Sequence, residues 1–226
     1  MSKTYSIAID GPAGAGKSTI ARRLAAELGY CYVDTGAIYR TVAYFLDLWG
    51  VSPKDTDGVN RYLDELTLGI EYDEQGKQHM IMNGMDVTED IRTPEISKLA
   101  SQVSARPAVR EMLLEMQRDL ARRHNVIMDG RDIGTVVLPR ADVKIFLTAS
   151  AQVRAERRFR EMEQKGEKTT LAQVLKQIQE RDYQDSHRDI APLKQAKDAV
   201  LVDTSELDID GAVAAIRAAA AQKIPL

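Results

Sequence analysis

Short apolar runs alternate with longer stretches of helical periodicity along this chain of 226 residues. The short runs predict strands at residues 5–9, 31–33, 126–128, 143–147 and 200–202. Apolar residues recur at helical spacing over residues 19–28, 107–120, 171–178 and 208–221. Strands that alternate with helices in this way are typical of an α/β fold, in which helices cover both faces of a parallel sheet.

The segment from about residue 66 to 87 departs from this rhythm. Apolar and polar residues alternate over 68–72 and again over 80–82, and the pair Asn83-Gly84 is a strong hairpin signal. We therefore expect a small antiparallel sheet inserted into the α/β core. The predicted organisation is one domain over 1–226, with a core of 1–60 and 96–226 and an insert of about 61–95.

A phosphate-binding sequence lies directly after the first predicted strand. Residues 11–18 match the pattern G-x-x-x-x-G-K-[ST] and lead into the first predicted helix. In such a loop the backbone N–H groups surround an anion, the helix N-terminus adds a favourable dipole, and Lys17 reaches the β- and γ-phosphates of a nucleotide. The hydroxyl of Ser18 is expected on a Mg²⁺ ion. The predicted ATP-binding residues are Gly11, Pro12, Ala13, Gly14, Ala15, Gly16, Lys17, Ser18 and Thr19.

Other nucleotide-binding classes fit the chain less well. Gly14-x-Gly16-x-x-Thr19 with Asp34 downstream imitates a dinucleotide fingerprint, but the third position lacks Gly or Ala and Lys17 has no role in that scheme. A switch GTPase would carry an N-K-x-D motif, which does not occur in the sequence. A motor or partitioning ATPase usually needs a larger chain or a dedicated oligomer interface. A small-molecule kinase is the favoured interpretation, and it requires further cations around an acceptor.

Composition and charge narrow the class further. Apolar residues make up 44% of the chain, charged residues 29%, and the net charge is −3. These values suit a soluble protein and argue against a general nucleic-acid binder, which would show a basic face. No apolar run has the length of a secretion signal or a membrane span, so we expect a cytoplasmic protein. The three histidines are isolated and lack cysteine partners, which argues against a zinc site.

Charged residues follow the predicted carboxyl ends of the strands, where ligands bind in parallel α/β sheets. Asp34 and Asp129 end two of the strands. Arg40 follows the first of them by about two helical turns, and Arg131 and Asp132 follow the second directly. Phosphoryl transfer requires such charges, because its catalysis is mostly positioning and neutralisation of the phosphoryl oxygens.

Two further sets of charged residues have the spacing of one helix face. They are Arg154, Arg157 and Arg158, and then Arg181, Asp185 and Arg188 if that helix extends so far. Taken one at a time, such arginines are more often solvated surface charges. Together with the cations at the strand ends, they predict a site for two phosphate-bearing ligands.

Six segments of the chain resemble the bacterial cytidylate kinase family. They are residues 11–18, 34–40, 100–103, 129–135, 143–147 and 180–182. The patterns D-[ST]-G-A-x-Y-R at 34–40 and D-G-R-D-x-G-T at 129–135 are highly specific among nucleoside monophosphate kinases. The resemblance runs from about Tyr5 to Thr204, and the insert resembles the enlarged monophosphate-binding insert of the bacterial type. Thr35 departs slightly from relatives that carry Ser, but the hydroxyl is retained.

The resemblance implies transfer of the γ-phosphoryl group of ATP to CMP or dCMP by a monomeric enzyme with Mg²⁺ as cofactor. The implied ligands of the acceptor phosphate are Arg40, Arg131 and Arg188. The implied ribose contacts are Arg181 and Asp185, and the implied cytosine contacts are Ser101, Arg110 and Asp132, with Thr35 nearby. The implied catalytic residues are Lys17, Arg131 and, on a lid of about 150–168, Arg154, Arg157 and Arg158. Ser18 would ligate the metal, and Asp129 would act on it through water.

The chemistry of the base supports one of these assignments independently. The N4 amino group of cytosine donates hydrogen bonds, so a carboxylate such as that of Asp132 suits it, whereas O4 of uracil accepts them and would be repelled. Two other interpretations stay open. The first is a kinase for UMP, dephospho-coenzyme A or shikimate, and the second is a nucleotide-dependent switch or binding module without transferase activity.

Overall fold

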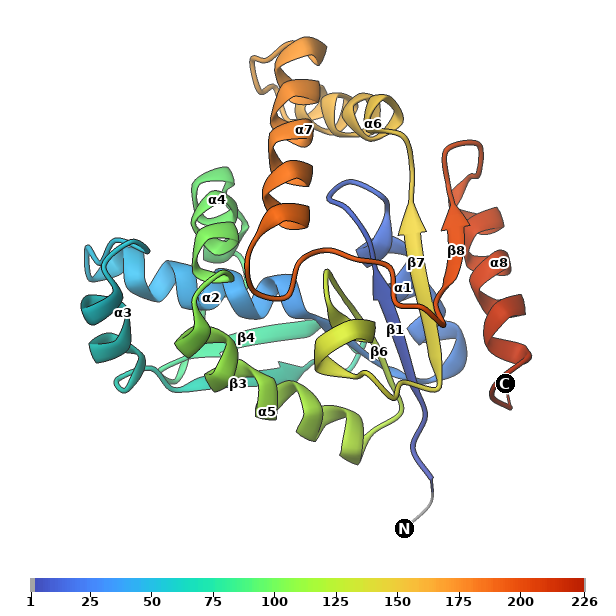
Figure 1. The fold of residues 1–226 in the computed structure, drawn as a ribbon, viewed down its shortest axis with the longest axis horizontal. Coiled ribbons are helices and arrows are strands. Elements are labelled where there is room, and N and C mark those ends of the chain that lie inside the picture. Colours follow the sequence, from blue (N-terminus) through green and yellow to red (C-terminus); the bar gives the residue numbers. More distant parts are fainter. Residues whose placement is uncertain (1–2, 226) are drawn as a thin grey trace.

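The sheet at the centre of the molecule has five parallel strands in the order β2-β6-β1-β7-β8 (Figure 1). In this computed structural model, which describes residues 3–225, the strands are β1 (Ser6–Asp10), β2 (Cys31–Asp34), β6 (Val126–Gly130), β7 (Val143–Thr148) and β8 (Val200–Asp203). All five predicted strands are confirmed. The predicted domain of 1–226 also includes residues 1, 2 and 226, which lie outside the described part.

The register of the strands brings three acidic residues to one edge of the sheet. Asp129 in β6 is paired with Ile9 in β1 and with Asp34 in β2. Asp10, Asp34 and Asp129 therefore stand at or next to the carboxyl ends of neighbouring strands. Because parallel strands all end at one edge, the segments that follow β1, β2 and β6 converge there.

Alternation along the central strand explains why helices cover both faces. In β1, Ile7 and Ile9 pack on one side with α1 (Lys17–Leu28) and α8 (Ile209–Ala221), whereas Ala8 packs on the other side with α2 (Thr35–Leu48) and α5 (Pro107–Arg123). Both apolar layers are thus supplied by strands that are buried on each face. No helix among residues 3–225 combines the length and the apolar character needed to cross a membrane.

The insert is an antiparallel sheet of three strands, as expected. It contains β3 (Leu68–Tyr72), β4 (Gln78–Met82) and β5 (Met85–Asp86), preceded by α3 (Thr56–Leu63) and followed by η1 (Asp90–Arg92) and α4 (Pro94–Val103). Asn83 and Gly84 turn the hairpin with φ angles of 49° and 82°, the positive values that a two-residue turn of this kind requires. The boundaries of the insert at 61 and 95 stay a prediction.

A helical hairpin rises above the carboxyl edge of the sheet (Figure 1). It consists of α6 (Ala151–Gln164) and α7 (Leu171–His187), and Thr170 begins α7 with a capping box to Gln173. Its own apolar core is small, with Ala155, Val174 and Ile178 buried between the helices. Since α7 runs well past the predicted end at residue 178, Arg181 and Asp185 lie on it, and Arg188 follows directly.

The phosphate-binding loop leaves β1 through a very close backbone approach. A Cβ atom added at Gly11 would lie 1.9 Å from the carbonyl oxygen of Leu147 in β7. The backbone oxygen of a central strand cannot move aside without loss of ladder hydrogen bonds, so only glycine fits here. This contact fixes where the loop begins relative to the sheet.

Replacement of Gly11 by alanine should therefore destabilise the protein by about 2–4 kcal/mol, because the methyl group forces β1 and β7 apart. Urea denaturation followed by circular dichroism would measure this free energy of unfolding. Gly76→Ala is the matched control, since Gly76 has a φ of 74° but open space around the added Cβ. Its cost should stay near the roughly 1–2 kcal/mol of a left-handed backbone alone. Equal losses in the two variants would contradict the steric argument.

Candidate active site

The loop between β1 and α1 folds around the side chain of Lys17. Lys17 is the first residue of α1, its side chain is buried, and its Nζ donates to the carbonyl oxygen of Pro12 at 2.8 Å. Gly14 and Gly16 have φ angles of 76° and 89°, which a residue with a Cβ rarely adopts. A loop of this form at a helix N-terminus offers backbone N–H groups to an anion.

The other residues of the loop differ in their exposure to solvent. Gly11, Pro12 and Ala15 are buried against the sheet edge, Ala13 and Gly16 are half-buried, and Gly14 and Thr19 are exposed. Ser18 is half-buried at the start of α1. The loop thus presents its polar backbone outward above a buried lysine.

Ser18 and Asp129 are brought together at the start of α1. The hydroxyl of Ser18 donates to one carboxylate oxygen of Asp129 at 2.8 Å, and the hydroxyl of Tyr32 donates to the other at 3.1 Å. Burial and the nearby charge of Asp34 raise the pKa of Asp129 to about 6. A hydroxyl beside a carboxylate is the type of oxygen donor set that suits Mg²⁺. Within residues 3–225 no group of three or more His, Cys, Asp and Glu side chains is arranged to hold a metal.

Lys17 lies in a field of like charge. Its burial and the proximity of Arg131 lower its pKa to about 7, although Asp129 acts in the opposite direction. The loss of hydration and the repulsion both penalise the ammonium form. An anion bound in the loop would relieve that penalty.

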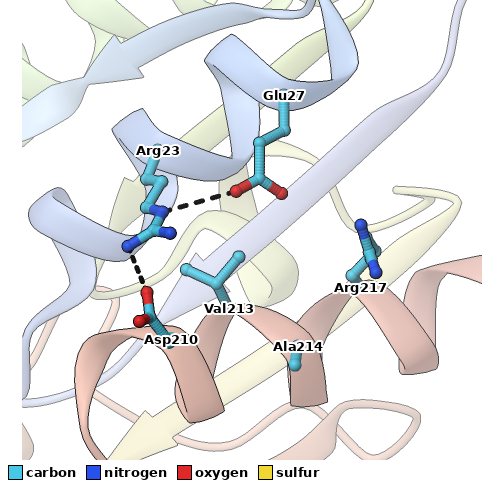
Figure 2. Close-up of a pocket in the computed structure, with 6 residues that line it drawn as sticks. All are labelled: Arg23, Glu27, Asp210, Val213, Ala214 and Arg217. Carbon is cyan, nitrogen blue, oxygen red and sulfur yellow. Dashed lines mark hydrogen bonds and ion pairs between the residues drawn. The ribbon is translucent and has the colours of Figure 1, made fainter.

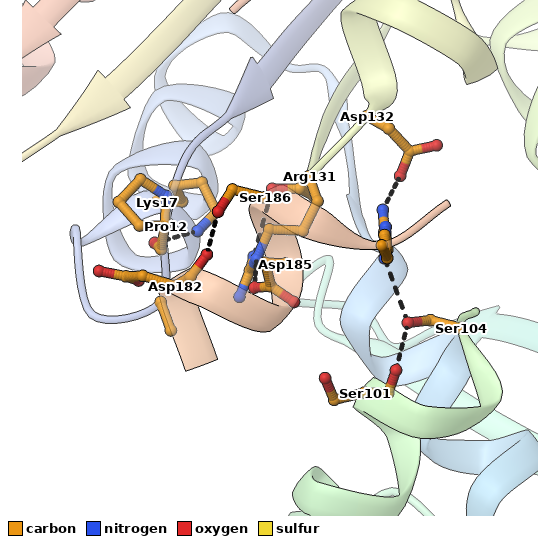
Figure 3. Close-up of polar contacts among 12 residues, drawn as sticks. Pro12, Lys17, Ser101, Ser104, Arg131, Asp132, Asp182, Asp185 and Ser186 are labelled. Carbon is orange, nitrogen blue, oxygen red and sulfur yellow. Dashed lines mark hydrogen bonds and ion pairs between the residues drawn. The ribbon is translucent and has the colours of Figure 1, made fainter. Parts of the chain in front are cut away.

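A buried carboxylate organises the second half of the site (Figure 3). Asp132 follows β6 and accepts hydrogen bonds from Arg110 on α5 and from Arg188, the latter at 3.1 Å. Arg188 also donates to the hydroxyl of Ser104 at 3.2 Å, and that hydroxyl donates to the carbonyl oxygen of Ser101 at 2.8 Å. Four of the predicted residues, which are Ser101, Arg110, Asp132 and Arg188, are therefore joined in one polar network.

A second ion pair lies between this network and the phosphate-binding loop. Arg131 donates through Nε to Asp185 on α7 at 2.8 Å (Figure 3). Although burial opposes ionisation, the charge of Arg131 and its hydrogen bond hold the pKa of Asp185 below its usual value. Asp185 is thus a buried, ionised partner of Arg131.

Two arginines of this region keep an unused hydrogen-bond donor. The Nε atoms of Arg40 and Arg181 are buried and have no hydrogen-bond partner among the described residues. Arg40 pairs with Asp34 through Nη2 at 3.0 Å. Burial and the neighbouring charge of Arg131 lower the pKa of Arg181 to about 10. Each guanidinium group therefore has a donor left for an anionic ligand, and the cost of removing that N–H group from water has already been met in folding.

The three lid arginines do not act as one set, although they share the spacing of a helix face. Arg154 is buried and donates to the carbonyl oxygen of Ala13 in the loop at 3.1 Å. Arg157 donates to the carbonyl oxygen of Thr204 after β8 at 2.6 Å. Arg158 pairs with Glu161 at 3.3 Å on the same helix, and its charge acts on Arg181.

The hydroxyl of Thr35 is used in a hydrogen bond to the backbone. Its buried Oγ1 donates to the carbonyl oxygen of Asp129 at 2.7 Å. This bond holds the end of β6 against the start of α2. A role of Thr35 in base contact stays a prediction.

Several side chains that sequence reasoning missed also position the site. Asp10 accepts hydrogen bonds from the backbone N–H groups of Ile133 and Gly134, both at 2.7 Å, at the start of η2 (Ile133–Val137). Gln78 of the insert bonds with the backbone of Asp34, and Asp182 pairs with Arg154. Asp10 was recognisable as a strand-end residue, but no local pattern indicates its partners.

Comparison with known proteins identifies the family of this chain. The sequence model of the family described as cytidylate kinase matches residues 7–222. This chain belongs to the cytidylate kinase family. It is a nucleoside monophosphate kinase by that membership, and the resemblance stated from its motifs is confirmed.

Similar members of the cytidylate kinase family include proteins of that name from two bacteria. The one from Lactobacillus johnsonii is 50% identical over 210 residues, which cover 93% of this chain and 91% of the relative. The one from Carboxydothermus hydrogenoformans is 50% identical over 208 residues, covering 92% and 93%. Among solved structures, an uncharacterized protein from Eubacterium ventriosum has the same fold, with a TM-score of 0.56 at 13% identity over 97% of this chain and 99% of that one.

Two surface hollows are lined by residues other than those of the polar network around Asp132. One of about 130 Å³ between α1 and α8 is lined by Arg23, Glu27, Asp210, Val213, Ala214 and Arg217. Arg23 pairs across it with Asp210 on α8 and, along α1, with Glu27 (Figure 2). Another of about 370 Å³ adjoins Lys144, which pairs with Asp198 at 2.9 Å. Neither hollow contains a residue predicted for ATP or CMP binding.

The lowered pKa of Lys17 should make the stability of the ligand-free protein depend on pH in a defined direction. The unfolded chain holds this proton up to a pKa near 10.5, whereas the folded protein releases it near 7. The unfolded state therefore binds more protons between these values, and stability rises with pH there. Relative to Lys17→Met, the free energy of unfolding should rise by up to about 1.4 kcal/mol for each pH unit between 7 and 10. Parallel urea-denaturation profiles of the two proteins over this range would contradict the lowered pKa.

Proposed function

We propose that this chain transfers the γ-phosphoryl group of ATP to CMP or dCMP, forming ADP and the nucleoside diphosphate, with Mg²⁺ and as a monomer. The observation that carries the choice of acceptor is the buried Asp132 carboxylate between Arg110 and Arg188. It stands at the same edge of the sheet as the phosphate-binding loop. A nucleotide whose base is held at Asp132 would direct its 5′-phosphate toward the arginines that lie between Asp132 and the phosphate-binding loop.

The Asp132 network suits cytosine for a physical reason. Its carboxylate offers only acceptors, which match the N4 amino group, while Arg110 and Arg188 offer only donors, which match N3 and O2 of cytosine. Uracil would place an acceptor, O4, against the carboxylate and leave buried groups unpaired. The network thus discriminates at the position where the two bases differ.

The cations between base pocket and loop suit the two phosphate groups. Arg40, Arg131 and Arg188, whose guanidinium group also reaches the base site at Asp132, would bind the acceptor phosphate. Arg181 and Asp185 would contact the ribose, with Asp185 held by Arg131 as the acceptor for a ribose hydroxyl. Lys17 and the loop amides would hold the β- and γ-phosphates of ATP. Ser18 would hold Mg²⁺ directly and Asp129 would act on it through water, and the ion would supply charge neutralisation at those phosphates. Arg158 has no buried protein anchor among the described residues and would approach the transferring phosphoryl group.

Direct in-line transfer needs no general base here. The attacking group is already an anionic phosphate, so no proton has to be removed before attack. Catalysis then consists of alignment and of neutralising the charge on the equatorial oxygens. The buried, partly unpaired guanidinium groups of this site serve both purposes.

The test is ADP formation from Mg-ATP with CMP, dCMP, UMP, AMP and GMP in turn, coupled to an optical readout. Turnover should be confined largely to CMP and dCMP and should stop when the metal is chelated. Efficient turnover of UMP would overturn the base-reading pocket. ADP formation that needs no acceptor would instead indicate a nucleotide-dependent switch. The same preparation should elute in gel filtration as a species of 25.1 kDa.

Asp132→Asn should lower the preference for CMP over UMP by about tenfold or more, because a buried hydrogen bond to a charged group contributes roughly 1.5–3 kcal/mol. The amide can donate to O4 of uracil as well as accept from N4 of cytosine. The measurement is the ratio of kcat/KM for the two acceptors. The KM for ATP should change little. Asp119→Asn is the control, because the half-buried Asp119 pairs only with Arg122 and Arg123 of its own helix, α5. An unchanged ratio would remove Asp132 from base recognition.

A further inference from the structure

Arg154 uses most of its hydrogen-bond donors within the protein and joins three segments. Its Nε donates to the carbonyl oxygen of Ala149 at 2.9 Å, and one terminal nitrogen donates to that of Ala13 at 3.1 Å. Both terminal nitrogens also bind the carboxylate of Asp182, at 2.9 and 2.6 Å. Four hydrogen bonds from a guanidinium with five N–H groups leave little capacity for a ligand.

The ion pair with Asp182 makes this junction rigid. A forked guanidinium–carboxylate pair fixes both distance and orientation. The side chain of Arg154 is 5% exposed and that of Asp182 27% exposed, so water screens the pair only partly. The loop itself packs close to this arginine, since a Cβ added at Gly14 would lie 3.3 Å from the Cβ of Arg154.

Asp182 lies between the two acceptor-side residues of α7. Arg181 precedes it directly, and Asp185, the partner of Arg131, follows it by three residues on the same helix. An α-helix moves as a rigid element over so short a span. A ligand that shifts Arg181 and Asp185 therefore also shifts Asp182, and with it Arg154 and the carbonyl group of Ala13.

We propose that Asp182 is a positioning residue that couples acceptor binding on α7 to the shape of the phosphate-binding loop through Arg154. Arg154 is then a joint between lid and loop, and it does not contact the transferring phosphoryl group. The inference rests on the proposed function, since it assumes an acceptor on α7 and a nucleotide in the loop. By linkage, each ligand tightens the binding of the other by the same factor.

Calorimetric titration of CMP with and without the Mg-bound β,γ-imido analogue of ATP measures this coupling. In the wild type, the analogue should lower the Kd for CMP by about fivefold or more, the range typical of coupled sites. In Asp182→Asn the factor should fall below about twofold, while the Kd for CMP alone changes far less. Arg154→Lys should behave alike, because lysine keeps the charge but loses the fork.

Glu180→Gln is the matched control on α7. The side chain of Glu180 is 59% exposed and pairs only loosely with Lys176, at 3.9 Å. This variant should keep the wild-type coupling factor. Thermal melting of all variants would identify any that unfold at the titration temperature. If Asp182→Asn is unfolded there, Arg154→Lys still tests the coupling.

The outcomes separate the inference from the proposed function. Acceptor-dependent ADP formation by the wild type tests the function alone. If the wild type turns over CMP but shows no coupling, or if both variants keep the wild-type factor, the role of Asp182 is overturned and the function stands. Arg158→Ala should lower kcat and keep the coupling factor. If Arg158→Ala instead keeps kcat and loses the coupling factor, Arg158 is the residue that couples the two sites, and the inference is overturned.

Discussion

The repulsion among buried cations at the carboxyl edge of the sheet is the constraint on which the site depends. Burial disfavours the charged forms of both Lys17 and Arg181, and the charge of Arg131 acts in the same direction. Such a cluster persists only where carboxylates oppose these effects, as Asp129 does for Lys17 and Asp185 does for both. The pKa values of Lys17 and Arg181 stay lowered all the same, and a pair of phosphate-bearing ligands would favour their charged forms. The folded protein thus holds these cations at an electrostatic cost, and a bound anion would lower that cost.

Ion pairs of this region also attach the helical hairpin of α6 and α7 to the sheet edge. The hairpin of α6 and α7 has a small apolar core of its own. Polar contacts that join it to the rest of the chain include Arg131 with Asp185, Arg188 with Asp132, and Arg154 with Ala13. The pair of Arg154 with Asp182 joins the two helices of the hairpin to each other. A ligand that competes for one of these partners therefore changes the forces on the lid. Substrate binding and lid position are linked because they use the same charges.

Much of this arrangement could be predicted from the sequence, because its signals are local. Strand alternation, the glycines of the loop and the turn at Asn83-Gly84 each depend on residues a few positions apart, and the structure has all three. The distribution of the lid arginines could not be predicted in this way. Arg154 and Arg157 stand three residues apart on one helix, yet their partners, Ala13 and Thr204, come from opposite ends of the chain. Helical spacing states which residues share a face, but not which distant segment meets that face. The pairing of Asp182 with Arg154 could not be predicted for the same reason.

Asp132 illustrates how a charge in this cluster can serve both structure and recognition. Two arginines bind it from different segments, which fixes the orientation of the carboxylate. A carboxylate has about four lone-pair sites, so two donors leave room for a third. An amino group of a base can take that room without breaking either ion pair, whereas a carbonyl oxygen would face a second acceptor. In the proposed base site, the ion pairs that hold Asp132 would therefore also make the site selective, because they prevent the carboxylate from turning away to suit the wrong base.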